Sequence, residues 1–161
     1  MSPMHEFEHF VRAQDRIYTQ VLAELRDGEK RSHWMWFILP QLAGLGSSAM
    51  AREFALTGRD DARRFLEHPV LGARLLECAA LVLGVNKKSA VEIFGRTDAM
   101  KLRSSATLFA EVSPPGSIFS RLLDRFFEGV PDPATMALLE RDSAPDVGST
   151  TSTSPKREWP P

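Results

Sequence analysis

The segment "PVLGARLLECAALVLG", residues 69–84, constrains the fold of this chain more than any other. Its apolar residues cover most faces of a helix, so other elements must surround it to keep it from water. Nowhere does the sequence show the apolar–polar alternation of a half-buried strand, or a repeat of fixed length. We therefore expect an all-α fold in which 69–84 is the central buried helix, with Pro69 in its first turn.

Helical spacing and capping residues predict seven to nine helices. Residues 5–27 carry apolar side chains at helical spacing up to Gly28, which predicts one long amphipathic helix. Ser89 and Glu92 form a capping-box pattern that begins a short helix ending at Gly95. The other helices are expected over 33–38 after Ser32, from Ser47 or Ser48 to about Leu56, over "DARRFLEH" after Asp60, from Thr97 to about Val112, over "IFSRLLDRFFEG" after Ser117, and from Asp132 and Pro133 to about Arg141.

These helices predict one compact, irregular multihelical domain over residues 1–142. The chain has 161 residues, enough to bury a core without a disulfide or a metal. The pattern is too irregular for a simple four-helix bundle. Residues 143–161 are rich in Ser, Thr and Pro and carry almost no apolar side chains, so we expect a disordered tail.

Composition excludes several classes of protein. The formal net charge is −1, which gives no support for binding to nucleic acid or to a membrane surface. The longest apolar run, "CAALVLGV", is too short to cross a bilayer, and the first residues carry no signal-peptide pattern, so we expect a cytoplasmic protein. The single cysteine, Cys78, excludes an internal disulfide and a cysteine-based zinc site, and we expect it to be buried. No metal or cofactor is predicted, and the oligomeric state stays open.

The segment "RSHWMWFILPQLAGLGSS", residues 31–48, concentrates aromatic and polar side chains. We expect Trp36 and the three apolar residues after it to form a buried plug. His33 and Gln41 must find hydrogen-bond partners if they are buried. Those partners are either internal groups or a ligand in a cavity walled by Trp34. The turn at Ser47 offers backbone amides that could bind an anion.

The segment "GRTDAMKLRSSATLF", residues 95–109, places Asp98, Lys101 and Ser105 on one helical face. It is either a solvated helix with a local Asp98–Lys101 pair or a place where Lys101, Ser104 and Ser105 bind a phosphate or carboxylate.

A third polar segment, "EHPVLGARLLE", carries His68 and Arg74. Structurally, His68 would cap the preceding turn and Arg74 would pair with Glu67 or Glu77. Alternatively, His68 is an acid or base. No nucleophile accompanies it in the sequence.

Three motifs together resemble the uncharacterised bacterial and fungal family called domain of unknown function 1810, some members of which are labelled calpastatin. They are "LRDGEKRSHWMWFILPQLAGLGSS", "FLEHPVLGARL" and "IFGRTDAMKLRSSATLF", and the resemblance runs from about Phe10 to Leu139. Leu39 and Ala106 depart from it, where the family often has Phe and Met. The resemblance implies a compact multihelical fold and no established reaction. It also implies that ten polar residues belong to family motifs: Lys30, His33, Gln41, Ser47, His68, Arg74, Asp98, Lys101, Ser104 and Ser105.

Two hypotheses of function follow. In the first, an enzyme or sensor binds an anionic, nucleotide-like small molecule: Lys101, Arg74 and the Ser47 turn hold the anion, Trp34 stacks on a ring, and His33 or His68 is the acid–base group. This hypothesis also draws on a fainter similarity to a helical family that removes ADP-ribose from nucleobases. In the second, the chain is a non-enzymatic interaction module, and Trp34 or Trp36 lies on an exposed aromatic surface.

Overall fold

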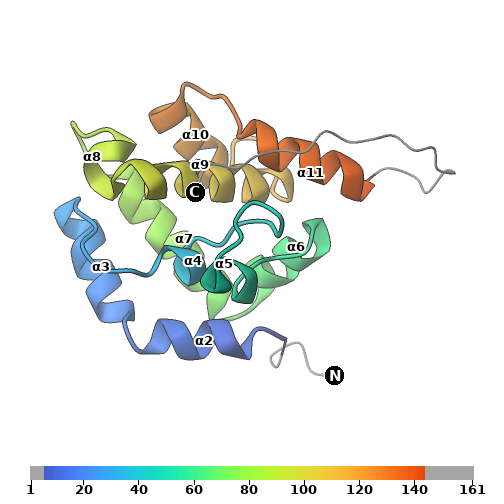
Figure 1. Ribbon diagram of the computed structural model, residues 1–161. Helices are drawn as coiled ribbons and strands as arrows, with labels where there is room; N and C mark the ends of the chain where they lie inside the picture. The colour runs from blue at the N-terminus through green and yellow to red at the C-terminus, as the bar shows by residue number, and fades with distance from the viewer. Residues whose placement is uncertain (1–5, 144–161) are drawn as a thin grey trace, which may run out of the picture.

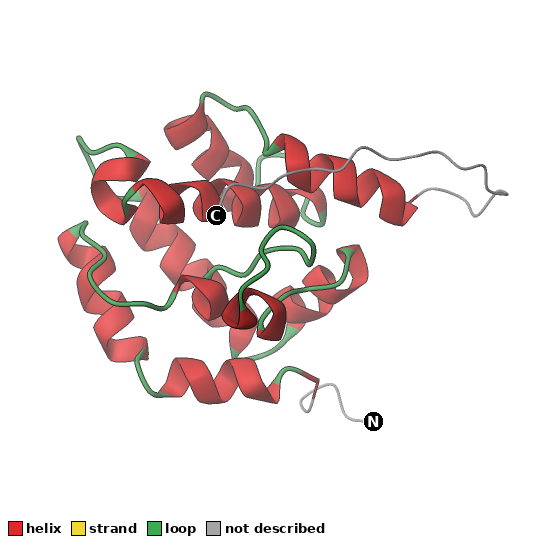
Figure 2. Cartoon of the chain, in the orientation of Figure 1, coloured by secondary structure: helices red, strands yellow, loops and turns green. Residues whose placement is uncertain are grey.

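The computed structural model describes residues 6–143, and their regular structure is helical apart from one isolated bridge between Leu42 and Leu56 (Figures 1 and 2). The predicted all-α class is confirmed. The tail predicted from residue 143 lies outside the described residues, except for Ser143 itself. The helices within residues 6–143 are α2 (Glu8–Asp15), α3 (Tyr18–Asp27), α4 (Met35–Ile38), α5 (Ala49–Glu53), α6 (Arg59–Glu67), α7 (Leu71–Leu83), α8 (Ala90–Phe94), α9 (Arg96–Glu111), α10 (Ile118–Phe127) and α11 (Pro133–Ser143).

Helices α7 and α9 form the centre of the molecule. Helix α7 contacts α3, α4, α6 and α10, and α9 contacts α6, α8, α10 and α11. Figure 1 shows α10 and α11 on one side of this pair and α2 on the other. The predicted central position of α7 is confirmed, although Leu76 on its outer face is 44% exposed.

Phenylalanine rings join several helices in the core. Phe10 of α2 and Phe65 of α6 lie 5.1 Å apart between ring centroids, and Phe65 lies 5.8 Å from Phe109 of α9. The ring of Phe119 in α10 follows at 5.5 Å. Edge and tilted contacts of this kind bury large apolar areas and favour one arrangement of the helices.

The single helix predicted over 5–27 is wrong, because the chain bends between α2 and α3. Ile17 leaves helical geometry with φ −134°, although neither Gly nor Pro stands there. The bend lets α2 contact α4 while α3 packs on α7. The side-chain amide of Gln14 then donates to the carbonyl of Phe37 at 2.8 Å. Tertiary contacts therefore override a continuous helical pattern.

Several predicted helix starts are confirmed and others move. The capping box of Ser89 and Glu92 is present, Ser117 caps α10, and Ser48, one of two candidates, caps α5. Asp132 also starts α11 as predicted, since its carboxylate accepts from the amide of Thr135 at 3.0 Å. Three other predicted caps are replaced by a nearby residue: Gly58 replaces Asp60, Gly95 replaces Thr97, and Trp34 replaces Ser32. No helix in the described part of the chain is long and apolar enough to cross a membrane.

Candidate functional site

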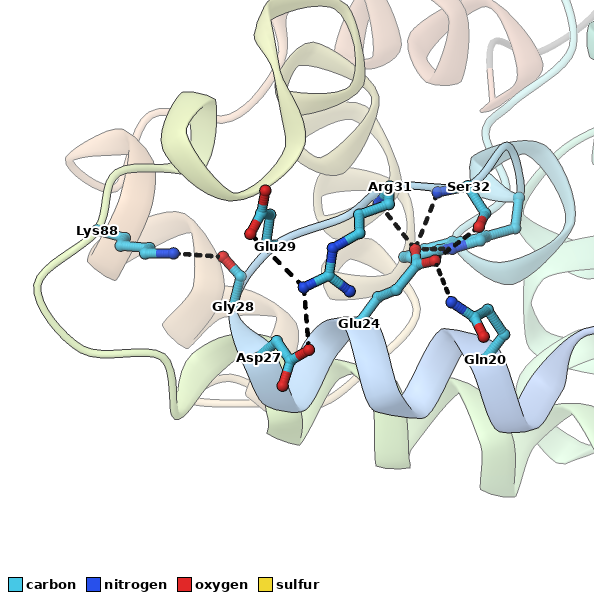
Figure 3. Close-up of polar contacts among 9 residues, drawn as sticks. Gln20, Glu24, Asp27, Gly28, Glu29, Arg31, Ser32 and Lys88 are labelled. Carbon is cyan, nitrogen blue, oxygen red and sulfur yellow. Dashed lines mark hydrogen bonds and ion pairs between the residues drawn. The ribbon is translucent and has the colours of Figure 1, made fainter.

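A buried carboxylate organises the segment that follows α3 (Figure 3). Glu24 is 0% exposed, and its Oε1 accepts from the amides of Arg31 at 2.8 Å and Ser32 at 3.0 Å, and from Trp34 Nε1 at 2.9 Å. Its Oε2 accepts from Gln20 Nε2 at 2.8 Å and from Ser32 Oγ at 2.6 Å. A buried charge needs this many donors to offset its desolvation. Glu24 therefore fixes the course of residues 29–34.

The environment of Glu24 also lowers the pKa of its carboxyl group. Burial alone would raise this pKa, but the hydrogen bonds from Ser32, Gln20 and the Arg31 amide outweigh it and lower the pKa to about 2. Sequence reasoning missed Glu24. A signal was available, since Glu24 lies one helical turn after Val21, on the apolar face of α3.

The fixed segment delivers Lys30 to helix α9. The Lys30 amide donates to the carbonyl of Ile93 at 2.8 Å, and its side chain is only 6% exposed. Its ammonium Nζ lies 2.8 Å from Asp98 Oδ2 and 4.9 Å from the centroid of the Trp34 ring. It also donates to the carbonyl of Ser32. Lys30 is thus an enclosed cation with several partners.

Lys101 approaches the same carboxylate from one turn along α9. Its Nζ lies 3.6 Å from Asp98 Oδ1 and 4.6 Å from the centroid of the Trp36 ring. Its side chain is 17% exposed, and it makes no hydrogen bond to the residues that the structure describes. Lys30 and Lys101 therefore share one carboxylate. We call Lys30, Asp98, Lys101 and Trp36 the two-lysine site.

The burial of the two tryptophans differs from what was predicted. Trp34 is fully buried, with its ring edge-on to Phe94 at 6.4 Å and its indole N–H donating to Glu24. It leaves no face for a ligand, so the prediction that Trp34 stacks on one is corrected. Trp36, expected in a buried plug, is half-buried, and its indole N–H makes no hydrogen bond within the described residues.

Ser104 and Ser105 are buried within the packing of α9. Ser104 Oγ contacts the carbonyl of Met100 at 3.1 Å and Asp132 Oδ2 at 3.2 Å, so it joins α9 to the start of α11. Ser105 is 1% exposed. Neither hydroxyl is placed as the anion-binding hypothesis requires. Ser47 is exposed and leaves the capping of α5 to Ser48.

His68 is the C-cap of α6, as predicted, and its side chain also binds the start of the helix that follows it. Its Nδ1 accepts from the amides of Val70 at 3.1 Å and Leu71 at 3.2 Å, at the start of α7. Its Nε2 is buried and without a partner among the described residues, as is Nε2 of Gln41. Burial lowers the pKa of the His68 imidazole.

Arg74 belongs to a cluster with α2 and α3, in which its ion-pair partner is Asp15. It pairs with Asp15 at 2.9 Å, donates to Gln14 Oε1 at 3.2 Å and lies over the ring of Tyr18 at 4.7 Å. The predicted pairing with Glu67 or Glu77 is therefore wrong. The structure brings Lys30, Asp98 and Lys101 together, whereas His68 and Arg74 contact other parts of the chain. His33 is exposed.

A cleft of about 420 Å³ lies between the ends of α3 and α7, and none of the predicted site residues lines it. Its wall includes Leu25, Arg26 and Gly28 from the α3 end, and Val85 and Lys88 from the α7 end. Among the described residues, no group of three His, Cys, Asp or Glu side chains is placed to hold a metal ion.

Comparisons with known proteins concern the sequence and the fold of most of the chain. A search among curated proteins finds no significant match. The crystal structure of the conserved hypothetical protein Rv1873 from Mycobacterium tuberculosis has a similar fold, with a TM-score of 0.80 and 46% sequence identity. That match covers 82% of this chain and 94% of the other. The model of a family of proteins of unknown function, DUF1810, matches residues 4–139. The chain therefore belongs to the DUF1810 family.

Proposed function

We propose that the protein binds a small anionic molecule at the two-lysine site. The observation that carries this proposal is the Lys101 ammonium, which is largely enclosed yet makes no hydrogen bond to a described residue. Two ammonium groups face one carboxylate, so the site holds an excess positive charge. Partial removal from water strengthens the attraction of that charge for an anion.

The two lysines have different roles in this site. The contact between Lys30 and Asp98 is short and enclosed, at 2.8 Å with 6% exposure of the lysine, so this pair supports the site. The contact between Lys101 and Asp98 is longer, at 3.6 Å, so Lys101 is free to reach an anionic oxygen. An enzyme would also use the exposed imidazole of His33 as acid or base, whereas a sensor would require binding alone.

The alternative, an interaction module, needs an exposed aromatic surface. Trp34 is buried and Trp36 half-buried. The large apolar residues that are exposed in the described part, Leu76, Val91 and Val130, belong to α7, α8 and the turn before α11. This distribution gives the alternative less support than the two lysines give to anion binding.

The test is a thermal-shift and calorimetric screen of the full chain against phosphate, nucleotides, sugar phosphates and small carboxylates. A ligand at a hundred times its dissociation constant stabilises the folded state by about 2.7 kcal/mol. We expect Lys101→Met to abolish the response to any ligand that binds. Arg26→Gln, an exposed change at the cleft, is the matched control and should retain it.

Three outcomes would contradict the proposal. One is silence across the whole panel. Another is a response that survives in folded Lys101→Met. The third is a response lost in Arg26→Gln, which would move binding to the cleft between α3 and α7.

A further inference from the structure

We infer that the anion carries a planar aromatic ring, and that this ring stacks on Trp36 where the Lys101 ammonium now lies. The inference rests on the proposed function and names the class of ligand for the same site. It follows from the contrast between two lysine–tryptophan pairs in the same region: Lys30 over Trp34, and Lys101 over Trp36.

Polar contacts hold both side chains of the first pair in place. Lys30 holds Asp98 at 2.8 Å and the carbonyl of Ser32, and Trp34 is fully buried. The indole N–H of Trp34 is already committed to Glu24 at 2.9 Å. Moving either side chain would break buried polar contacts, which is costly. This pair therefore supports the fold and has no capacity left for a ligand.

In the second pair, no hydrogen bond within the described residues holds either side chain. Lys101 lies 3.6 Å from Asp98, beyond hydrogen-bond distance, and makes no hydrogen bond within the described residues. The indole N–H of Trp36 is likewise uncommitted among them, and its ring is half-buried. The lysine stem has four flexible carbons, so its ammonium can move without displacing α9.

An anionic oxygen is a better partner for the Lys101 ammonium than the ring it now covers. A charge-assisted hydrogen bond is stronger than a cation–π contact at a partly exposed site. The ammonium therefore turns towards the anion and uncovers one face of Trp36. A flat aromatic ring on the same ligand can stack on that face. A saturated ligand covers a flat indole poorly and gains less.

The experiment compares matched ligands on the full chain at constant ionic strength. Phenyl phosphate and cyclohexyl phosphate have similar size and charge but differ in planarity. AMP and ribose 5-phosphate differ by the aromatic base. We expect about a tenfold tighter dissociation constant by calorimetry for the aromatic member of each pair, with quenching of tryptophan fluorescence.

Variants assign the preference to its residues. Trp36→Leu should bring the affinity ratio within each pair close to one. Trp36→Phe should retain part of the preference for the aromatic ligand, and this variant provides the test if Trp36→Leu does not fold. Lys101→Met should lose all four ligands. Arg26→Gln should behave as the wild type.

The outcomes separate this inference from the function on which it rests. Equal affinities within both pairs, with binding still lost in Lys101→Met, would overturn the aromatic ring but leave anion binding intact. A preference that persists in Trp36→Leu would place the stacking elsewhere and also overturn it. No binding of any of the four anions to the wild type would overturn the inference, and a silent wider screen would remove the proposed function as well.

Discussion

Glu24 and Lys101 carry opposite charges, and their surroundings give them different roles. Both oxygens of Glu24 are saturated by donors from the segment that it holds and from Gln20 of its own helix, so its charge stabilises the fold. Lys101 has one carboxylate at 3.6 Å and an aromatic ring, and makes no hydrogen bond within the described residues. At the scale of single residues, unused hydrogen-bonding capacity separates a candidate binding group from a structural one.

Glu24→Gln should reduce the free energy of unfolding by about 2–3 kcal/mol, since an amide nitrogen would face donors that now meet a carboxylate. The pKa of Glu24 is lowered from 4.5 to about 2, so its stabilisation is complete above pH 4.5 and is lost as the pH falls towards 2. Urea denaturation between pH 7 and pH 3 measures both effects. The exposed Glu29→Gln is the control and should cost less than about 0.5 kcal/mol. Equal stabilities of the two variants would contradict the role of Glu24.

His68 should make the folded state sensitive to mild acid. Its folded pKa is lowered from 6.5 by burial, and protonation of Nδ1 would oppose the amides of Val70 and Leu71. The unfolded chain takes up the proton first, so stability is complete above pH 6.5 and falls as the pH drops below it. His68→Asn keeps an oxygen acceptor for the amides and should show a flatter melting temperature between pH 7 and pH 5. The same slope in both proteins would refute this assignment.

At the scale of elements, Gly72 sets how closely α6 approaches α7. A Cβ atom built at Gly72 would lie 1.9 Å from the carbonyl oxygen of Leu66. No side chain fits at that distance, so the backbone of α7 meets the end of α6 only because residue 72 is glycine. The two helices then place Phe65 against the rest of the core.

Gly72→Ala should cost about 3 kcal/mol, at the upper end of overpacking effects, because backbone and not a flexible side chain must give way. Gly84→Ala, at the end of the same helix, meets only ordinary contacts at 3.4 Å or more and should be nearly neutral. Thermal melts of the two variants measure this difference in stability. A Gly72→Ala protein as stable as Gly84→Ala would show that α6 and α7 can separate freely.

At the scale of the whole molecule, α7 and α9 connect almost every other helix. Cys78 lies on α7 with 0% exposure. Burial raises the pKa of its thiol to about 12, although a hydrogen bond with Tyr18 acts in the opposite direction. A thiol in this position reports on the opening of the entire core.

A thiol reagent at pH 8 should therefore label Cys78 slowly in native buffer. Labelling should accelerate with urea in step with the loss of helical circular dichroism, since both would require global unfolding. Rapid labelling without urea would show that α3 or α10 detaches from α7 locally. The unfolded chain in high urea gives the reference rate.

The sequence by itself determined the helical class, the central position of α7, the Ser89 capping box, the start of α10 and the membership of the family. These features depend on periodicity and on residues within one turn of each other. The local pair of Asp98 with Lys101, one of the two readings of residues 95–109, is present as well, whereas the contact of Asp98 with Lys30 is long-range and was not predicted.

Only the tertiary structure decided the bend between α2 and α3, the burial of Trp34, the saturation of Glu24 and the pairing of Arg74 with Asp15. Each depends on which segments meet across the core, and no local pattern contains that information. Trp34 and Trp36 differ by two positions in the sequence. Trp34 is part of the core, where its indole N–H donates to Glu24 of α3. Trp36 is part of the candidate site, where Lys101 of α9 lies over its ring.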